Sequence, residues 1–257
     1  MKLIDWIAIL GALAWTPHLF SLVKNMITKP EVRIITPRIV ELGFTTLGSI
    51  FNLHLAFSVK NRDLVISSLK IHLVHENGEE KIFDWQGIQQ HVMRMRAPDG
   101  SVLPYEKEQS VLAMKLNEKD IEERFIQFQE ASFQISKYDF ENKAVKKITY
   151  LKNQKKYEPE EFMKSQEMQD VINFVKHSFS WKAGVYTFTI EVQSPEQFKL
   201  VDNRYQFTLT PVDIEELEKN KNEIEHDYKY QMVPQDDEEY TKVNWNWRYP
   251  SLRKLNQ

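Results

Sequence analysis

The chain has 257 residues, 42% hydrophobic, 28% charged and 12% aromatic, which is typical of one large globular domain or two small ones. It contains no cysteine, which excludes thiol nucleophiles, iron–sulfur clusters, cysteine-ligated zinc and disulfides. The formal net charge of -3 gives no overall field that would attract nucleic acid or anionic lipid.

An apolar run at residues 6–23 contains no Asp, Glu, Lys or Arg, and its length is at the short end of what spans a bilayer. Trp6 and Trp15 suit a membrane interface, and a spanning helix tolerates Pro17 when hydroxyls or neighbours re-satisfy the freed carbonyl. His18 is the one ionisable side chain inside the run, and it marks a channel, a helix–helix contact or a snorkelling position. The run therefore predicts a single-pass membrane anchor.

Two other interpretations of this run stay open. One is a helix that lies in the membrane interface or packs on a partner. The other is a signal peptide cut near residues 12–14, which the apolar residues beyond that point disfavour. Basic residues lie mostly after the run, at Lys24, Lys29, Arg33 and Arg38. By the positive-inside rule, this asymmetry predicts an inner (cytoplasmic) membrane protein whose C-terminal body lies in the cytoplasm.

Beyond Pro30, the hydrophobic pattern changes to the period of two that is typical of β-strands. A short β-branched stretch at residues 31–36 comes first. Residues 50–60 are the clearest strand of the chain, because alternate positions are apolar throughout. One face of this strand carries Phe51, Leu53, Leu55, Phe57 and Val59.

A β-hairpin is predicted next. Strands at residues 68–75 and 81–85 flank Asn77-Gly78, a dipeptide preferred in type I′ turns because both residues accept positive φ. We expect residues 86–108, which contain two prolines and an Asp-Gly pair, to form a long connection.

The middle of the chain is expected to interrupt the strands. Residues 109–116 and 123–129 are predicted strands, and β-forming residues favour a strand over a helix in the second. The Lys-rich residues 136–156 are expected to form a solvated insertion. A helix is predicted from Pro159, with an apolar stripe of Met168, Val171, Ile172, Val175 and Phe179.

Strands return at residues 185–192 and 205–210, and a charged helix follows at 212–228. Its thin apolar seam consists of Ile214, Leu217 and Ile224. Strands early, helix in the middle and strands late, without regular βαβ alternation, predict an antiparallel β-sandwich.

Two stretches resemble bacterial immunoglobulin-like domains. Residues 181–190, Trp-Lys-Ala-Gly-Val-Tyr-Thr-Phe-Thr-Ile, are similar to a late strand of this class, in which a Gly turn precedes a Tyr-x-Phe-x-Ile alternation. Residues 51–59 and 66–73, with the turn between them, resemble its early strands. The resemblance implies an immunoglobulin-like β-sandwich in a bacterial membrane-anchored protein. It implies no catalytic residues, because the class is defined by its core.

The expected fold is mainly β with added helices. Residues 1–29 form the membrane-spanning or membrane-associated helix. Residues 30–211 form the immunoglobulin-like antiparallel β-sandwich, with a helical and Lys-rich insertion at about 130–180. Residues 212–257 form a C-terminal helix and an aromatic tail.

Motifs for catalysis and cofactors are absent from the sequence. Gly43 and Gly48 have the spacing of a phosphate-binding loop, but the Lys that such a loop needs is missing. His72 and His75 would point to opposite faces of a strand, which one metal ion cannot use. His54 could meet His72 across neighbouring strands, although a polar sheet face explains both equally well. The sequence therefore predicts no catalytic residue, no metal site and no cofactor.

Two groups of residues are candidates for contacts with a partner or with phosphates. The first is a cluster of Lys143, Lys146, Lys147, Lys152, Lys155 and Lys156. It could contact phosphates of nucleic acid or of the inner leaflet. Lysine lacks the planar, bidentate geometry with which arginine recognises phosphate, so a solvated insertion is favoured. The second is the C-terminal aromatic tail, with Trp245, Trp247 and Tyr249. These residues either pack back on the domain, which we favour, or dock on a partner.

The favoured function is a membrane-anchored binding or interaction module with a cytoplasmic β-sandwich and no identifiable catalysis. Its partner would be the membrane together with a protein or a second copy of the chain, rather than nucleic acid. One alternative is a membrane effector or sensor of a bacterial stress or antiviral defence system, whose N-terminal helix oligomerises or perturbs the bilayer. Another is an enzyme with an unrecognised site, because function depends on sites rather than on folds.

Overall fold

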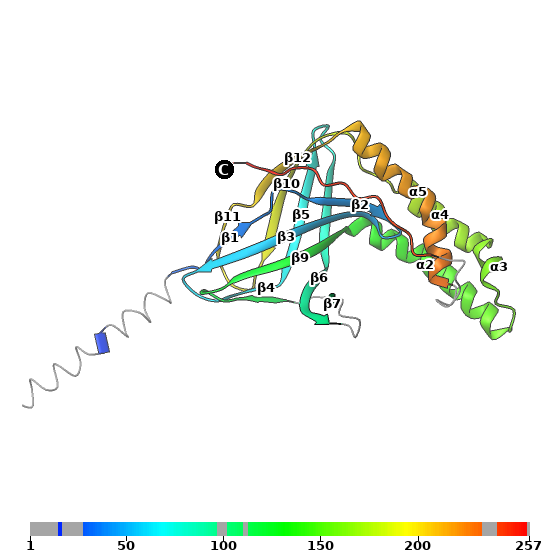
Figure 1. Cartoon of the computed structure of the whole chain (residues 1–257), viewed down its shortest axis with the longest axis horizontal. Helices are drawn as coiled ribbons and strands as arrows, with labels where there is room; N and C mark the ends of the chain where they lie inside the picture. Colours follow the sequence, from blue (N-terminus) through cyan, green and yellow to red (C-terminus); the bar gives the residue numbers. More distant parts are fainter. Residues whose placement is uncertain (1–14, 17–27, 97–101, 110–112, 233–240, 256–257) are drawn as a thin grey trace, which may run out of the picture.

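The computed structural model describes residues 15–16, 28–96, 102–109, 113–232 and 241–255. They form a mainly β structure in which a curled sheet meets a group of helices at one end (Figure 1). The predicted mainly β fold with added helices is therefore confirmed.

No helix among the described residues is both long and apolar enough to span a bilayer. Of the residues singled out in the predicted anchor, Trp6, Pro17 and His18 lie outside the described part of the chain, whereas Trp15 is helical and 68% exposed. The anchor and the cellular location stay predictions.

Hydrogen bonds join the main strands into one eleven-stranded sheet. Its continuous path is β11 (Lys199–Val201), β1 (Glu31–Ile35), β3 (Gly48–Lys60), β9 (Ile121–Glu130), β6 (Glu80–Arg96), β5 (Ser68–His75), β10 (Gly184–Gln193), β12 (Arg204–Leu209) and β13 (Arg253–Lys254). Two further strands extend it, β2 (Glu41–Thr45) beside β3 and β7 (Val102–Gln109) beside β6. The pair β1–β11 is parallel and the other pairs are antiparallel. An immunoglobulin-like sandwich, with two facing sheets, stays a prediction.

The apolar stripe predicted on β3 is confirmed. All five of its side chains are at most 2% exposed. Phe51 lies at the centre of the core, and its ring centroid is 5.1 to 6.5 Å from those of four other phenylalanines, namely Phe83, Phe128, Phe188 and Phe207. Those rings come from β6, β9, β10 and β12, so one residue of β3 ties together strands from distant parts of the chain.

The predicted hairpin between β5 and β6 is confirmed, but its turn is not type I′. Gly78 has a φ of +89°, whereas Asn77 is not in the left-handed region. The Gly78 N–H donates to the His75 carbonyl at 2.8 Å, and the His75 N–H donates to the Glu79 carbonyl at 2.9 Å. This is a three-residue loop, a type I turn followed by a left-handed glycine. Asn77 stabilises it differently, because its side-chain oxygen accepts from the Glu79 N–H at 3.0 Å.

The long connection expected at residues 86–108 is wrong, because β6 continues to Arg96 and pairs with β7. Gly87 lies at a bulge opposite β9, where an irregular register accommodates a glycine. Pro104 lies in β7, which pairs only with β6 among the described strands, and an edge strand tolerates a missing N–H.

The strand predicted at residues 109–116 is shorter than expected. Its described strand residues are β8 (Met114–Leu116), and residues 110–112 lie outside the described part of the chain. β8 pairs with β4 (Leu64–Ile66) in a two-stranded ribbon separate from the main sheet. The strand predicted at 123–129 is confirmed, because it lies within β9.

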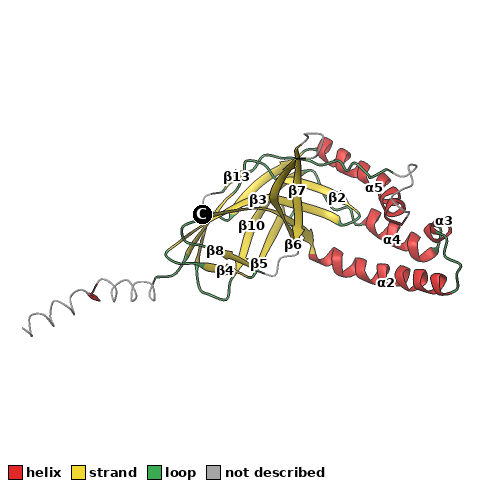
Figure 2. Ribbon diagram, turned by 60° about the horizontal axis from the view of Figure 1, so that its bottom comes forward, coloured by secondary structure: helices red, strands yellow, loops and turns green. Residues whose placement is uncertain are grey.

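Four helices form an arm that extends from one end of the sheet (Figure 2): α2 (Ala131–Asn153), α3 (Pro159–Met163), α4 (Gln166–His177) and α5 (Pro211–Met232). The solvated insertion expected at residues 136–156 is instead largely the long helix α2. The single helix expected from Pro159 is two helices, because Ser165 caps a new start by accepting the Met168 N–H at 3.4 Å. Met168, Val171, Ile172 and Val175 are buried as predicted.

The C-terminal tail, residues 241–255, runs back along the β2 side of the sheet, shown in red in Figure 1. Leu42 and Arg248 exchange two backbone hydrogen bonds of 2.9 Å each, and β13 pairs with β12. Trp247 covers Gly43 so closely that a Cβ there would lie 2.2 Å from the indole ring. The tail therefore packs on the domain as an added strand-like segment.

Candidate functional site

The helix α2 starts directly after β9 and is fixed to the sheet by its first turns. Phe133 packs on Gly48, where a Cβ would lie 2.7 Å from the ring. The φ of Gly48 is +80°, so this position requires glycine both for its backbone and for the contact. The joint between sheet and arm is therefore tightly specified.

One side of α2 packs against the rest of the arm. Phe133 and Phe140 stack on Phe174 of α4, with ring centroids 5.4 and 4.7 Å apart. Lys137 is 7% exposed, and its amine lies 2.9 Å from Glu141, one turn further along. This side has the burial expected for a helix in a packed layer.

The other side of α2 exposes large apolar side chains. Ile135 is 73% exposed, Tyr138 is 64% exposed and Val145 is 56% exposed. Their spacing of three and seven residues places them on one side of the helix, and we call them the arm stripe. Tyr150 is similarly exposed, at 61%, but lies about 120° away around the helix axis from Tyr138. An exposed apolar stripe opposite a packed face is typical of a protein contact surface.

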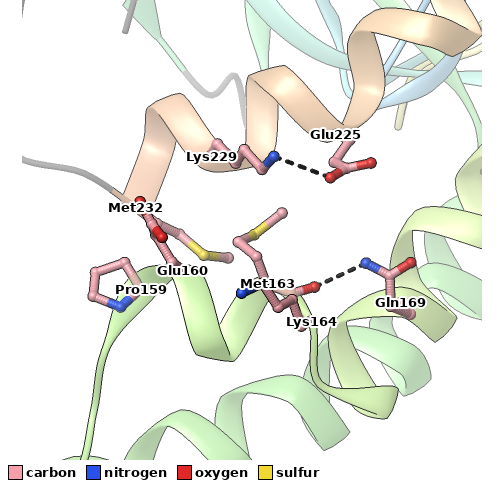
Figure 3. A pocket seen from close by; sticks show the side chains of 8 residues that line it. All are labelled: Pro159, Glu160, Met163, Lys164, Gln169, Glu225, Lys229 and Met232. Carbon is pink, nitrogen blue, oxygen red and sulfur yellow. Dashed lines mark hydrogen bonds and ion pairs between the residues drawn. The ribbon is translucent and has the colours of Figure 1, made fainter. Parts of the chain in front are cut away.

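A cleft of about 250 Å³ opens between α3, α4 and α5 on the same arm. Its apolar lining comes from Pro159, Met163 and Met232 (Figure 3). Glu225 and Lys229 form an ion pair of 3.1 Å across one turn of α5. The volume is smaller than that of a typical pocket for a drug-sized ligand and is suited to one bulky side chain. Flexible methionines favour adaptable contacts of this kind.

The six lysines of the predicted cluster do not share one face. Lys143 lies over the Phe140 ring and Lys152 over the Tyr157 ring, at 5.4 and 5.0 Å from the centroids. Lys147 lies one turn after Lys143 and pairs with Glu167 at 3.6 Å, whereas Lys152 lies on another side of the helix. Lys146 is exposed on α2, and Lys155 and Lys156 follow the end of the helix. The structure therefore distributes this cluster around and beyond α2.

The tail aromatics are divided between the core and the surface. Trp245 packs against the hydrophobic core, and Trp247 covers Gly43. Tyr249 is 55% exposed, and its pKa is raised, first by partial burial and then by the nearby Glu41 carboxylate. The two tryptophans therefore have a clear structural role.

The expectation that His54 could meet His72 across neighbouring strands is wrong, because β9 and β6 separate their strands. His54 approaches Glu123 at 3.9 Å and His72 approaches Glu80 at 3.1 Å. Within the described ranges, no group of three or more His, Asp or Glu side chains could hold a metal ion.

Sequence reasoning missed the arm stripe, because the lysines of α2 hid its apolar residues. The available signal was the spacing of Ile135, Tyr138 and Val145. No protein-family model matches the chain, and no curated protein or solved structure is significantly similar to it. The functional interpretation therefore depends on this chain's own residues.

Proposed function

We propose that the protein is a membrane-anchored interaction module with a cytoplasmic, immunoglobulin-like β body, and that its helical arm binds a protein partner. The arm stripe is the observation that carries this proposal. Ile135, Tyr138 and Val145 are more than half exposed on a helix whose opposite face is already packed. A partner that covers them removes apolar surface from water without rearranging the arm.

The position of the arm supports the same function. In Figure 1, β1 lies at one end of the sheet and the helices gather at the other. Because the predicted anchor precedes β1 in sequence, the sheet would hold the arm away from the bilayer. The arm is then accessible to a cytoplasmic protein.

The adjacent cleft offers a second contact on the same arm. Met163 in the cleft is 3% exposed and belongs to the hydrophobic core, whereas Met232 is only partly buried. A single apolar side chain of the partner fits this space and would fix the register of a helix bound along the arm.

The size of the complex extracted from native membranes in mild detergent tests the proposal. We expect wild-type protein to elute in a complex larger than its own 30.6 kDa chain allows, as measured by size exclusion with light scattering. A Tyr138→Asp/Val145→Asp variant should elute as the monomer, because a partner cannot bury two unpaired carboxylates.

A Tyr150→Asp variant is the matched control, because this residue is as exposed as Tyr138 but lies about 120° from Tyr138 and about 140° from Val145 around the axis of α2. It should keep the complex. A wild-type monomer, or a complex that survives both stripe substitutions, would contradict the assignment of the arm stripe as the contact surface.

A further inference from the structure

A hollow of about 300 Å³ lies at the opposite end of the molecule from the arm, where β1 meets the C-terminal tail. Three segments far apart in sequence build it. Residues 34–38 form one wall, Asp202 and Tyr205 form the second, and Leu252 and Lys254 form the third. The Leu252 N–H donates to the Arg38 carbonyl at 2.7 Å, which fixes the tail against the first wall.

The hollow is positively charged. Arg33 and Lys254 both approach one carboxylate, that of Asp202, at 3.6 and 2.7 Å. Arg38 also lines the hollow and has no ion-pair partner in the described part of the chain. The lining residues Arg38, Lys254 and Asp202 sum to a charge of +1, and Arg33 adds a further positive charge beside Asp202. Asp202 is the one acidic side chain that lines the hollow among the described residues.

Two more arginines lie near the hollow but on the opposite face of the β12–β13 pair, because Tyr205 and Lys254 face the hollow and side chains alternate along a strand. Arg204 and Arg253 are exposed. Arg253 lies opposite Gln206 in the β12–β13 pair, and the Leu255 N–H donates to the Arg204 carbonyl at 3.0 Å. The cations that line the hollow are therefore Arg38 and Lys254, which are far apart in sequence and are brought together by folding.

Aliphatic side chains border the charged hollow. Ile35 is 45% exposed and Ile39 is 47% exposed, on either side of Arg38. Arginine and lysine beside exposed aliphatic side chains suit the boundary between lipid headgroups and acyl chains. Only seven residues, 24–30, separate the predicted anchor from β1, so their reach is at most about 25 Å.

We propose that this hollow binds the phosphate of an anionic lipid headgroup, and so orients the β body on the membrane surface. Arg38 and Lys254 are placed to contact the phosphate, Asp202 offsets part of the charge of Arg33 and Lys254, and Ile35 and Ile39 rest on the lipid. The proposal rests on the membrane anchor of the proposed function and is independent of the partner on the arm.

The test uses the full chain in vesicles of phosphatidylcholine, alone or mixed with phosphatidylglycerol. Because the chain has no cysteine, Ser251→Cys accepts a single fluorophore beside the hollow. Lipids with a quencher in the headgroup then report how close this region lies to the surface. Quenching should be stronger in the phosphatidylglycerol vesicles, and the difference should shrink at high salt.

Variants that remove a positive or a negative charge from the hollow should change quenching in opposite directions. Arg38→Gln should weaken headgroup binding about fivefold at low salt, because each basic residue near an anionic surface contributes about that factor. Asp202→Asn should strengthen quenching, and Asn accepts the left-handed φ of +66° at this position. Lys146→Gln, on the arm, is the charge-matched control and should change nothing.

The proposal is overturned if quenching is equal in the two kinds of vesicle, or if Arg38→Gln leaves quenching unchanged. It is also overturned if the protein does not co-float with either kind of vesicle in a density gradient. Displacement of the labelled region from the vesicles by soluble glycerol phosphate would assign the hollow to a free phosphate instead. A stripe-dependent complex extracted from native membranes would leave the arm's function standing when the headgroup proposal fails.

Discussion

The β body and the helical arm use apolar residues in different ways. In the body, alternation along β3 buries every residue of its apolar face, and Phe51 meets four other rings. In the arm, α2 buries Phe133 but leaves Ile135 and Tyr138 exposed. The β3 face of the body is fully buried within the fold, whereas α2 of the arm leaves apolar side chains exposed. The body therefore stabilises the fold, and the arm has apolar surface available for binding.

The largest expected effect comes from the centre of the body. Phe51→Ala should lower the free energy of unfolding by about 3–5 kcal/mol, because it removes contacts with four rings and leaves a cavity. Urea unfolding followed by tryptophan fluorescence measures this loss. A cost as small as that of Ile135→Ala on the arm would break the distinction between the two regions.

The joint between the two regions should be the next most sensitive position. Gly48→Ala should cost about 2–4 kcal/mol, because a side chain is strained at positive φ and also meets the Phe133 ring. Gly78→Ala is the control for strain alone, since its φ is +89° and nothing lies within 4 Å of its Cβ position. Equal losses for both variants would show that Phe133 does not restrain the arm.

The ion pair between Arg248 of the tail and Asp213 of α5 should make a smaller, pH-dependent contribution to the free energy of unfolding. Burial alone would raise the pKa of Asp213, but hydrogen bonds from Thr210 and Arg248 outweigh it and hold the pKa below its usual 3.8. The Arg248 Nε lies 2.7 Å from this carboxylate.

Because the folded pKa lies below the unfolded one, the Asp213 carboxylate stabilises the fold above its usual pKa. This contribution is lost as the pH falls through the lowered folded pKa. Asp213→Asn should therefore cost about 1–2 kcal/mol at neutral pH, and the difference from wild type should disappear in strong acid. Urea unfolding at both conditions measures it. A constant difference across this range would show that ionisation of Asp213 is not the cause.

The smallest effect on stability is expected at the arm stripe. Tyr138→Ala should change the free energy of unfolding of the isolated protein by less than about 0.5 kcal/mol, because the side chain is already mostly in water. The same urea titration measures it. A loss comparable to that of a core residue would mean that Tyr138 supports the fold rather than a partner.

Sequence periodicity predicted the strands whose side chains alternate cleanly between core and surface. β3, β5 and β10 have this pattern, and their boundaries were predicted to within two residues. The continuation of β6 beyond residue 85 and the whole of β7 were missed because Gly87 and Pro104 resemble turn signals, although a bulge and an edge strand accommodate them. Local patterns do not show whether a glycine or proline interrupts a strand or sits in its irregular part.

The two candidate surfaces differ in how far the sequence could reveal them. The spacing of Ile135, Tyr138 and Val145 is present in the sequence, but its meaning depends on knowing that α2 is a helix with Phe133 packed on the other side. The basic hollow could not be found in this way, because Arg38, Asp202 and Lys254 meet only when the tail folds back on the sheet. Both surfaces depend on tertiary contacts between distant segments.

Hydroxyl-radical footprinting of Tyr138 and Tyr150 most directly tests whether the arm stripe binds a partner. The two tyrosines have nearly equal exposure, 64% and 61%, on different sides of one helix. We predict that Tyr138 is oxidised more slowly in native membranes than in the isolated protein, whereas Tyr150 reacts equally in both. Equal oxidation of Tyr138 in both preparations would contradict the account.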